Sequence, residues 1–151
     1  MSNIMRVSDA ASLAIHAVKA LAESPETAVT VSSIAEKLNV SEAHLAKVLQ
    51  RLTRAKMVSA NRGPGGGFKL TRDPANLTLL DVYEAIEGPL EVNGCLLGEP
   101  ACGSGLCMLA TLMRSTQTDL RNYFKGITFA QIATDLNKNQ GALKTSRERS
   151  A

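Results

Sequence analysis

Apolar residues recur every three or four positions through the first part of the chain, and this spacing predicts helices rather than strands. A first helix is expected from Ser8 to Leu21, ending before Ser24-Pro25 because proline cannot continue a helix. Thr30 is expected to cap a short second helix, and Ser41 a longer third one. The positions predicted to face the core are Leu13, Ala14, Ala17, Val18, Leu21, Ile34, Ala35, Leu38, Leu45, Val48, Leu49 and Leu52. Two helices separated by about three residues are typical of a helix-turn-helix.

A glycine-rich hairpin is predicted to follow these helices. Residues 57–60 and 68–70 have the composition of strands, and the sequence between them is Asn-Arg-Gly-Pro-Gly-Gly-Gly. A hairpin tip usually needs one glycine, so four of them indicate a backbone that approaches a partner closely; a merely flexible turn is the alternative. A phosphate-binding loop of nucleotide enzymes is disfavoured, because no Lys-Ser/Thr pair follows and the chain returns into a strand.

The second half of the chain is predicted to contain further helices. Thr78 and Asp81 resemble a capping box that opens a helix through Glu87, and residues 128–136 have the pattern of a short last helix. A long helix is expected over residues 107–124, with an apolar stripe formed by Leu109, Leu112, Met113, Thr116 and Leu120. Such a stripe, with no later domain to pack against, is typical of a dimerisation helix; a plain core helix is the alternative.

The predicted fold is therefore mainly α: a winged helix-turn-helix domain with a long C-terminal dimerisation helix. The DNA-binding domain is expected over residues 1–75, the cysteine loop and dimerisation helices over 76–136, and a disordered tail over 137–151. A hydrophobic content of 44% with only 3% aromatics favours aliphatic helix packing. No apolar run approaches the ~20 residues that a membrane span needs.

Charge is unevenly distributed along the chain. Residues 1–72 carry ten Lys/Arg and five Asp/Glu, whereas residues 73–151 carry seven and nine. Between Lys47 and Arg72 there are seven basic residues and no acidic one. This imbalance indicates an anionic partner for the first half of the chain.

The three cysteines of the chain, Cys95, Cys102 and Cys107, lie in one short segment that is broken by glycines and a proline. Thiolates are soft ligands that suit iron–sulfur clusters and zinc, so the segment is interpreted as a ligand set; redox-active thiols without metal are the alternative. A disulfide is disfavoured, because the number is odd and the N-terminal residues lack a secretory h-region. This argues for a reducing compartment, the cytoplasm.

Several motifs together resemble one known family. They are Ser33-Ile-Ala-Glu-Lys-Leu38, Arg62-Gly-Pro-Gly-Gly-Gly-Phe68 and Leu79-Leu-Asp-Val-Tyr-Glu-Ala-Ile-Glu-Gly88, followed by the three cysteines. In these residues the chain resembles the bacterial winged-helix regulators of the IscR and NsrR type, which carry iron–sulfur clusters. The resemblance implies a homodimer that binds a palindromic operator in double-stranded DNA, with no membrane role. It also implies a regulator, expected to be a repressor, that senses iron, nitric oxide or redox state through its cluster.

The same resemblance implies that Cys95, Cys102 and Cys107 hold a [2Fe-2S] or [4Fe-4S] cluster, with gaps of six and four residues where the family has five and five or nearly so. The family's histidine position is Ala110 here, and its alternative aspartate position is Ser12. Asp9, one turn earlier and contributed by the partner subunit, is the first candidate for the fourth ligand. Ser12, Glu99, His16 and a small external ligand remain alternatives. His16 is otherwise expected to be an interior residue.

The residues expected to contact DNA lie on the third helix and the hairpin. N-terminal turns of a recognition helix enter the major groove, whereas arginines farther along are expected to contact phosphates or form ion pairs. The candidates are Ser41, Glu42, His44, Lys47 and Arg51 on the helix, and Arg62, Gly63, Gly65, Gly66 and Lys69 on the hairpin. The rival hypotheses are a zinc-bound or cluster-free thiol-based redox regulator of the same fold, and an adaptor that uses the winged fold for protein contacts. An enzyme is disfavoured, because the chain has no Ser/His/Asp arrangement and only two histidines.

Overall fold

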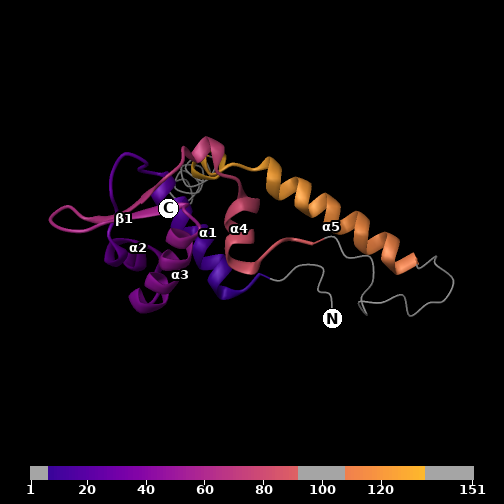
Figure 1. Ribbon diagram of the computed structural model, residues 1–151, viewed down its shortest axis with the longest axis horizontal. Helices are drawn as coiled ribbons and strands as arrows, with labels where there is room; N and C mark the ends of the chain where they lie inside the picture. Colours follow the sequence, from indigo (N-terminus) through magenta and orange to yellow (C-terminus); the bar gives the residue numbers. More distant parts are fainter. Residues whose placement is uncertain (1–6, 92–107, 135–151) are drawn as a thin grey trace, which may run out of the picture.

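The computed structural model describes residues 7–91 and 108–134 of the chain (Figure 1). Its elements are α1 (Asp9–Ala22), α2 (Val31–Leu38), α3 (Glu42–Arg54), β1 (Val58–Asn61), β2 (Gly67–Leu70), a 3-10 turn η1 (Pro74–Asn76), α4 (Leu79–Glu87) and α5 (Met108–Gly126). Residues 129–134 form a last short helical segment. The predicted fold, mainly α with a winged helix-turn-helix, is confirmed.

Side-chain caps fix where most of these helices begin. The Thr30 hydroxyl accepts a hydrogen bond from the Ser33 N–H at 3.2 Å, and the hydroxyl of Ser8 accepts one from the Ala11 N–H at 3.1 Å. Thr78 and Asp81 form the predicted capping box with both of its bonds. Ser41 occupies the N-cap position of α3, but its side chain makes no capping bond. Local sequence therefore sets the helix starts, with α3 left open at its N-terminus.

The wing is a two-stranded antiparallel hairpin that projects from the helices (Figure 1). Val58 pairs with Leu70 and Asn61 with Gly67, so the first strand lies one residue later than predicted. Val29 adds a bridge on the other side of β2, because its N–H and carbonyl exchange hydrogen bonds with Phe68 at 2.9 and 2.8 Å. These bonds anchor the base of the wing to the segment that precedes α2.

One hydrophobic core is shared by α1, α2, α3, the wing strands and α4. The predicted core positions of α1, α2 and α3 are buried, with Leu38 partly exposed. Leu77, Val82, Ile86 and Phe129 belong to the same core, so residues on both sides of position 75 pack together. A second, smaller cluster of Leu80, Tyr83 and Leu90 packs against Leu120 and Phe124 of α5. None of the helices in the described part of the chain is long and apolar enough to cross a membrane.

A partly buried ion-pair cluster connects the C-terminal end of α1 to α2. Lys19 donates to one carboxylate oxygen of Glu23 at 2.8 Å, and Lys37 donates to the other. Burial by itself would raise the pKa of Glu23, but hydrogen bonds and charge from Lys19 and Lys37 outweigh it and lower the pKa below its ordinary value. The Glu23 carboxylate therefore stabilises the folded state fully at pH values above the ordinary pKa of a glutamate. This contribution is lost as the pH falls through the lowered pKa.

Glu23→Gln is expected to reduce the free energy of unfolding at pH 7 by about 1 kcal/mol or less, since the pair is partly exposed. The difference from wild type should be smaller at a pH below the lowered pKa of Glu23 than at pH 7, because the carboxyl is then protonated in both the folded and the unfolded protein. Urea unfolding at both pH values measures it. Glu26→Gln is the matched control, because the side chain of Glu26 is 93% exposed. Equal effects of the two variants would contradict a role for the Glu23 pair.

Candidate nucleic-acid interface and cysteine segment

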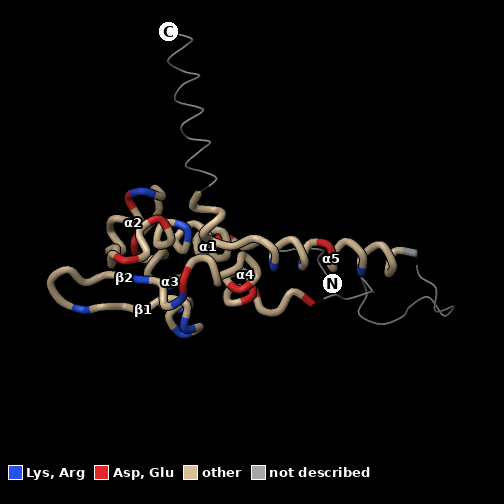
Figure 2. Tube along the Cα trace, turned by 90° about the horizontal axis from the view of Figure 1, so that it is seen from above, with Lys and Arg blue, Asp and Glu red and all other residues tan. Residues whose placement is uncertain are grey.

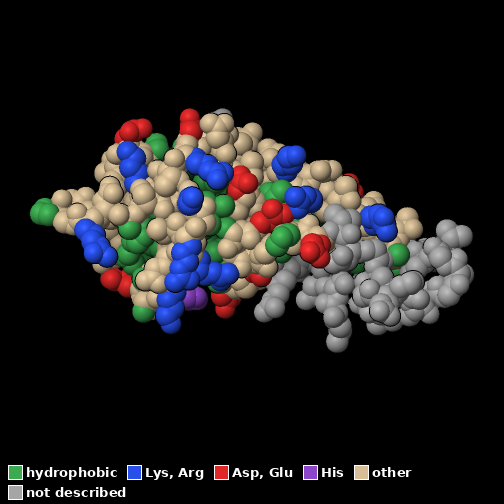
Figure 3. Space-filling view, in the orientation of Figure 1, with side chains coloured by type: hydrophobic (Ala, Val, Ile, Leu, Met, Phe, Trp, Pro, Cys, Tyr) green, Lys and Arg blue, Asp and Glu red, His purple; other side chains and the backbone are tan. Residues whose placement is uncertain are grey.

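The outer face of α3 carries the predicted recognition residues. Leu45, Val48 and Leu49 face the core, whereas Glu42, His44 and Lys47 are exposed. Lysine and arginine side chains gather over this helix in the space-filling view (Figure 3). The arrangement presents the first turns of a helix, with basic residues along it, to a single surface. That is the geometry with which a helix-turn-helix enters the major groove.

The N-terminus of α3 adds favourable electrostatics to this surface. Ser41 is exposed and its hydroxyl makes no capping bond, so it is free to donate to or accept from a partner. Unsatisfied N–H groups and the helix dipole both favour an anion here. Phosphate groups of a nucleic acid backbone match that preference.

The wing presents an exposed loop beside this face. Lysine and arginine positions occur on α3 and on both arms of the hairpin (Figure 2). Arg62, Gly63, Pro64 and Gly65 are all exposed. Gly63 and Gly65 have φ of +104° and +74° with open space around them, so their surface can be approached closely by a partner.

Gly66, a predicted DNA-binding residue, also has a role inside the wing. A Cβ at this position would lie 2.5 Å from the carbonyl oxygen of Asn61 and 2.7 Å from that of Gly63, because the tip folds tightly and the Gly66 N–H bonds to Gly63 O at 2.8 Å. The turn itself therefore requires Gly66, and substitution there would deform the wing whether or not DNA is bound. The DNA contact of Gly66 stays a prediction, as do those of Gly63 and Gly65, but a Gly66 variant would not test it separately from the turn.

Two of the predicted DNA-binding cations have partners within the chain that the sequence did not reveal. The guanidinium of Arg51 donates to the carbonyl of Ile86, the penultimate residue of α4. Lys69 donates to the backbone carbonyl of Glu26 at 3.2 Å and lies 3.5 Å from its carboxylate. Both contacts join residues far apart in sequence, so only the fold brings them together. Arg54, by contrast, is exposed and has no partner among the described residues.

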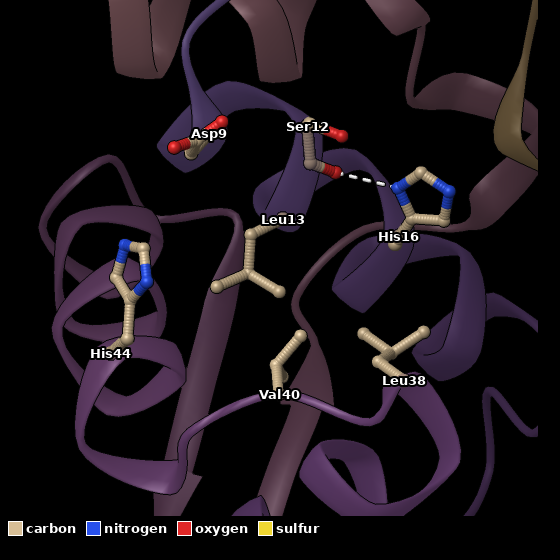
Figure 4. A pocket seen from close by; sticks show the side chains of 7 residues that line it. All are labelled: Asp9, Ser12, Leu13, His16, Leu38, Val40 and His44. Carbon is tan, nitrogen blue, oxygen red and sulfur yellow. Dashed lines mark hydrogen bonds between the residues drawn. The ribbon is translucent and has the colours of Figure 1, made fainter.

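A groove of about 390 Å³ separates α1 from the start of α3 (Figure 4). Leu13, Leu38 and Val40 supply its apolar surface, and its polar lining residues are Asp9, Ser12, His16 and His44. His16 is exposed rather than interior, because it follows Ser12 by one turn on the outer face of α1. Its Nδ1 lies 2.7 Å from the Ser12 carbonyl oxygen. The expectation of a buried histidine was therefore wrong.

The predicted metal ligands are only partly described by the structure. Cys95, Cys102 and Cys107 lie outside the described residues, as does Glu99. Asp9 is exposed at the start of α1, close to Ser12, where a second molecule could reach it. Within residues 7–91 and 108–134, no three His, Asp or Glu side chains come together as a metal site. The cysteine ligand set therefore stays a prediction, and its chemistry, three soft thiols in one segment, fits an iron–sulfur cluster.

The fold is that of a winged helix-turn-helix protein, and the family and relatives that match the chain are transcription regulators rather than enzymes. The chain belongs to the Rrf2 family, whose model, described as that of an iron-dependent transcriptional regulator, matches residues 7–135.

Known proteins show the same relationship. The chain is 40% identical over 83 residues to BadM of Rhodopseudomonas palustris, which is named as an HTH-type transcriptional regulator. The match covers 55% of this chain and 53% of BadM, so this chain spans about half the length of that relative. It is 30% identical over 141 residues to the HTH-type regulator NMA1593 of Neisseria meningitidis, covering 91% of this chain and 94% of that one. The solved structure of T. potens IscR superposes with a TM-score of 0.74 at 24% identity, covering 90% of this chain and 91% of that chain.

Proposed function

We propose that this chain is a homodimeric repressor that binds a palindromic operator and changes its affinity when an iron–sulfur cluster is gained, lost or modified. Cys95, Cys102 and Cys107 would hold the cluster, with Asp9 of the second subunit as the candidate fourth ligand. The signal would be iron status, nitric oxide or redox state, sensed in the cytoplasm.

The observation that carries the proposal is the combination of three cysteines in one segment with a family described as iron-dependent. A cluster bound there would supply a redox-active group whose presence constrains the segment between α4 and α5. The thiols would hold the group, and the neighbouring glycines would let the backbone turn around it. Because α4 packs against α1 and α3, a constraint placed directly after α4 lies close to the recognition helix.

The outer face of α5 supports a dimer. Leu109, Leu112 and Tyr123 are 54%, 56% and 65% exposed, and they lie on one stripe of the helix together with Thr116. Beside this stripe, Met113 and Gln117 are buried and Leu120 is partly buried within the same subunit. The predicted apolar stripe is therefore half covered, and its uncovered half has the three- and four-residue spacing of a helix pair. A second copy of α5 is the partner that this spacing fits best.

Such a dimer would present two copies of α3 and two wings to DNA. Related half-sites would then lie about one helical turn, ~34 Å, or a multiple of it apart. Residues at the start of α3 would read base edges, while the wing and Arg51, farther along α3, would contact the backbone.

Arg62→Ala is expected to weaken binding to operator and to unrelated duplexes alike, because a phosphate contact carries no sequence information. The slope of log affinity against log salt should flatten by about 1. Fluorescence anisotropy at several salt concentrations measures both quantities. Lys125→Ala, at the C-terminal end of α5, removes the same charge from a position outside α3 and the wing and should leave the slope unchanged. An Arg62→Ala slope equal to that of wild type would exclude the wing contact.

Spectroscopy on anaerobically purified protein tests the cofactor directly. A brown protein with visible absorption and an iron–sulfur Mössbauer signature supports the proposal and identifies the cluster type. A colourless protein, with zinc or with free thiols, would instead favour the thiol-based redox regulator of the same fold. Titration of the coloured protein with nitric oxide and with oxygen would then identify the signal.

A further inference from the structure

The C-terminal end of α4 is held by the recognition helix. The last carbonyls of an α-helix lack partners within the helix. In α4, the Gly88 N–H donates a hydrogen bond to the carbonyl of Glu84 at 3.0 Å, and the guanidinium of Arg51 donates one to the carbonyl of Ile86. A cation at this end is also favoured by the helix dipole. Arg51 therefore joins α3 to the last turn of α4.

The same end of α4 is bonded to two further helices. Ser8, the cap of α1, donates its N–H to the Glu87 carboxylate at 3.0 Å, and its hydroxyl donates to the same oxygen. Arg121 of α5 forms an ion pair with Glu84 and donates to the carbonyl of Leu90 at 3.1 Å. The backbone N–H of Leu90 in turn donates to Glu84 at 3.0 Å. Residues 84–90 are thus a junction of α1, α3, α4 and α5, and the cysteine segment follows directly in sequence.

Arg51 lies on the side of α3 that is predicted to face DNA. It follows Lys47 by four residues and His44 by seven, so the three side chains share one face of the helix. The residue is exposed although it is bonded to α4. A guanidinium has five N–H donors, so the donor engaged by Ile86 leaves others for a phosphate oxygen.

We propose that Arg51 binds an operator phosphate and that the Ile86 carbonyl holds its guanidinium in the orientation for this contact. The placement of the α4 end would then set operator affinity. Holding the side chain in advance reduces the entropy lost on binding. A change in the segment after α4 would move this carbonyl and misplace the guanidinium. The identity of the signal that causes the change rests on the proposed function; the contact between Arg51 and the α4 end does not.

The test compares Arg51→Lys with the matched variant Arg54→Lys, both of which keep the charge of α3. Lysine lacks the planar fork that can bind a carbonyl and a phosphate together. Operator affinity of Arg51→Lys should fall about tenfold, whereas Arg54→Lys should stay within about twofold of wild type. Arg51→Gln keeps an amide donor but loses the charge, so its salt slope should flatten by about 1. Thermal unfolding of all variants distinguishes these effects from loss of fold.

The second quantity to measure is the ratio of the operator affinity of cluster-loaded protein to that of cluster-free protein. Arg51→Lys should reduce this ratio toward 1, and Arg54→Lys should preserve it. Equal affinities and ratios for the two variants would overturn the proposal, as would an Arg51→Lys protein that binds weakly but keeps the full wild-type ratio. A wild-type ratio of 1 would contradict the cluster-sensing function instead. In that case the affinity and salt comparisons still decide whether Arg51 is positioned as proposed.

Discussion

Replacing any one of Cys95, Cys102 or Cys107 with alanine is expected to abolish the visible absorption of the anaerobically purified protein. A cluster held by three thiolates loses a third of its protein thiolates with each substitution, and the remaining two cannot enclose it stably. Iron and sulfide content should fall together with the absorption. Because all three cysteines act as one site, the three single variants should resemble one another and the triple variant.

Ser104→Ala is the matched control for this experiment. It alters the same segment without removing a thiol, so the colour should remain. Asp9→Ala should shift the spectrum without bleaching it if that carboxylate is the fourth ligand. Three single cysteine variants with full colour would refute the ligand assignment.

Leu112→Asp is expected to convert the protein into monomers. Leu112 is 56% exposed at the centre of the uncovered stripe of α5, so the aspartate would be tolerated in an isolated subunit. In a dimer it would bury an unpaired carboxylate, which costs several kcal/mol. Analytical ultracentrifugation measures the change in mass. Since two half-sites must be bound together, operator affinity should fall by at least about a hundredfold.

Thr118→Asp provides the control, because it places the same charge on the opposite, exposed face of α5. This variant should remain dimeric and bind the operator as wild type does. If Asp9 of one subunit reaches the cluster of the other, the Leu112→Asp monomer should also lose its cluster readily. A monomer with an intact and unshifted spectrum would contradict that cross-subunit ligand, and a Leu112→Asp dimer would contradict the α5 interface.

Local sequence was sufficient for most of the fold. The spacing of Leu45, Val48, Leu49 and Leu52 predicts a helix with one buried face, and the structure buries that face in the core. The Thr78–Asp81 capping box was also predictable, since both of its bonds join residues three apart. These features depend on neighbours in sequence, which is why they could be foreseen.

Other features depend on the tertiary structure and could not be predicted from the sequence. The bond between Arg51 and Ile86 joins residues 35 apart, and nothing local marks either as a partner. The glycines of the wing were correctly predicted to form a tip, but the sequence did not show that the crowded turn itself requires Gly66. His16 was placed inside by its apolar surroundings in sequence, although its helical position puts it beside Ser12 on the outer face. The cysteine ligand set rests on thiol chemistry and on the family, and stays a prediction.

The most direct test of the central claim is the operator affinity of one protein preparation measured anaerobically before and after removal of its cluster. An operator selected from a random duplex library can be titrated by fluorescence anisotropy at fixed salt, with an unrelated duplex alongside. A sensing role requires a coupling of about 1–3 kcal/mol, so the two forms should differ about 5- to 150-fold for the operator and little for the unrelated duplex. Equal operator affinity of the loaded and cluster-free dimers would contradict the account.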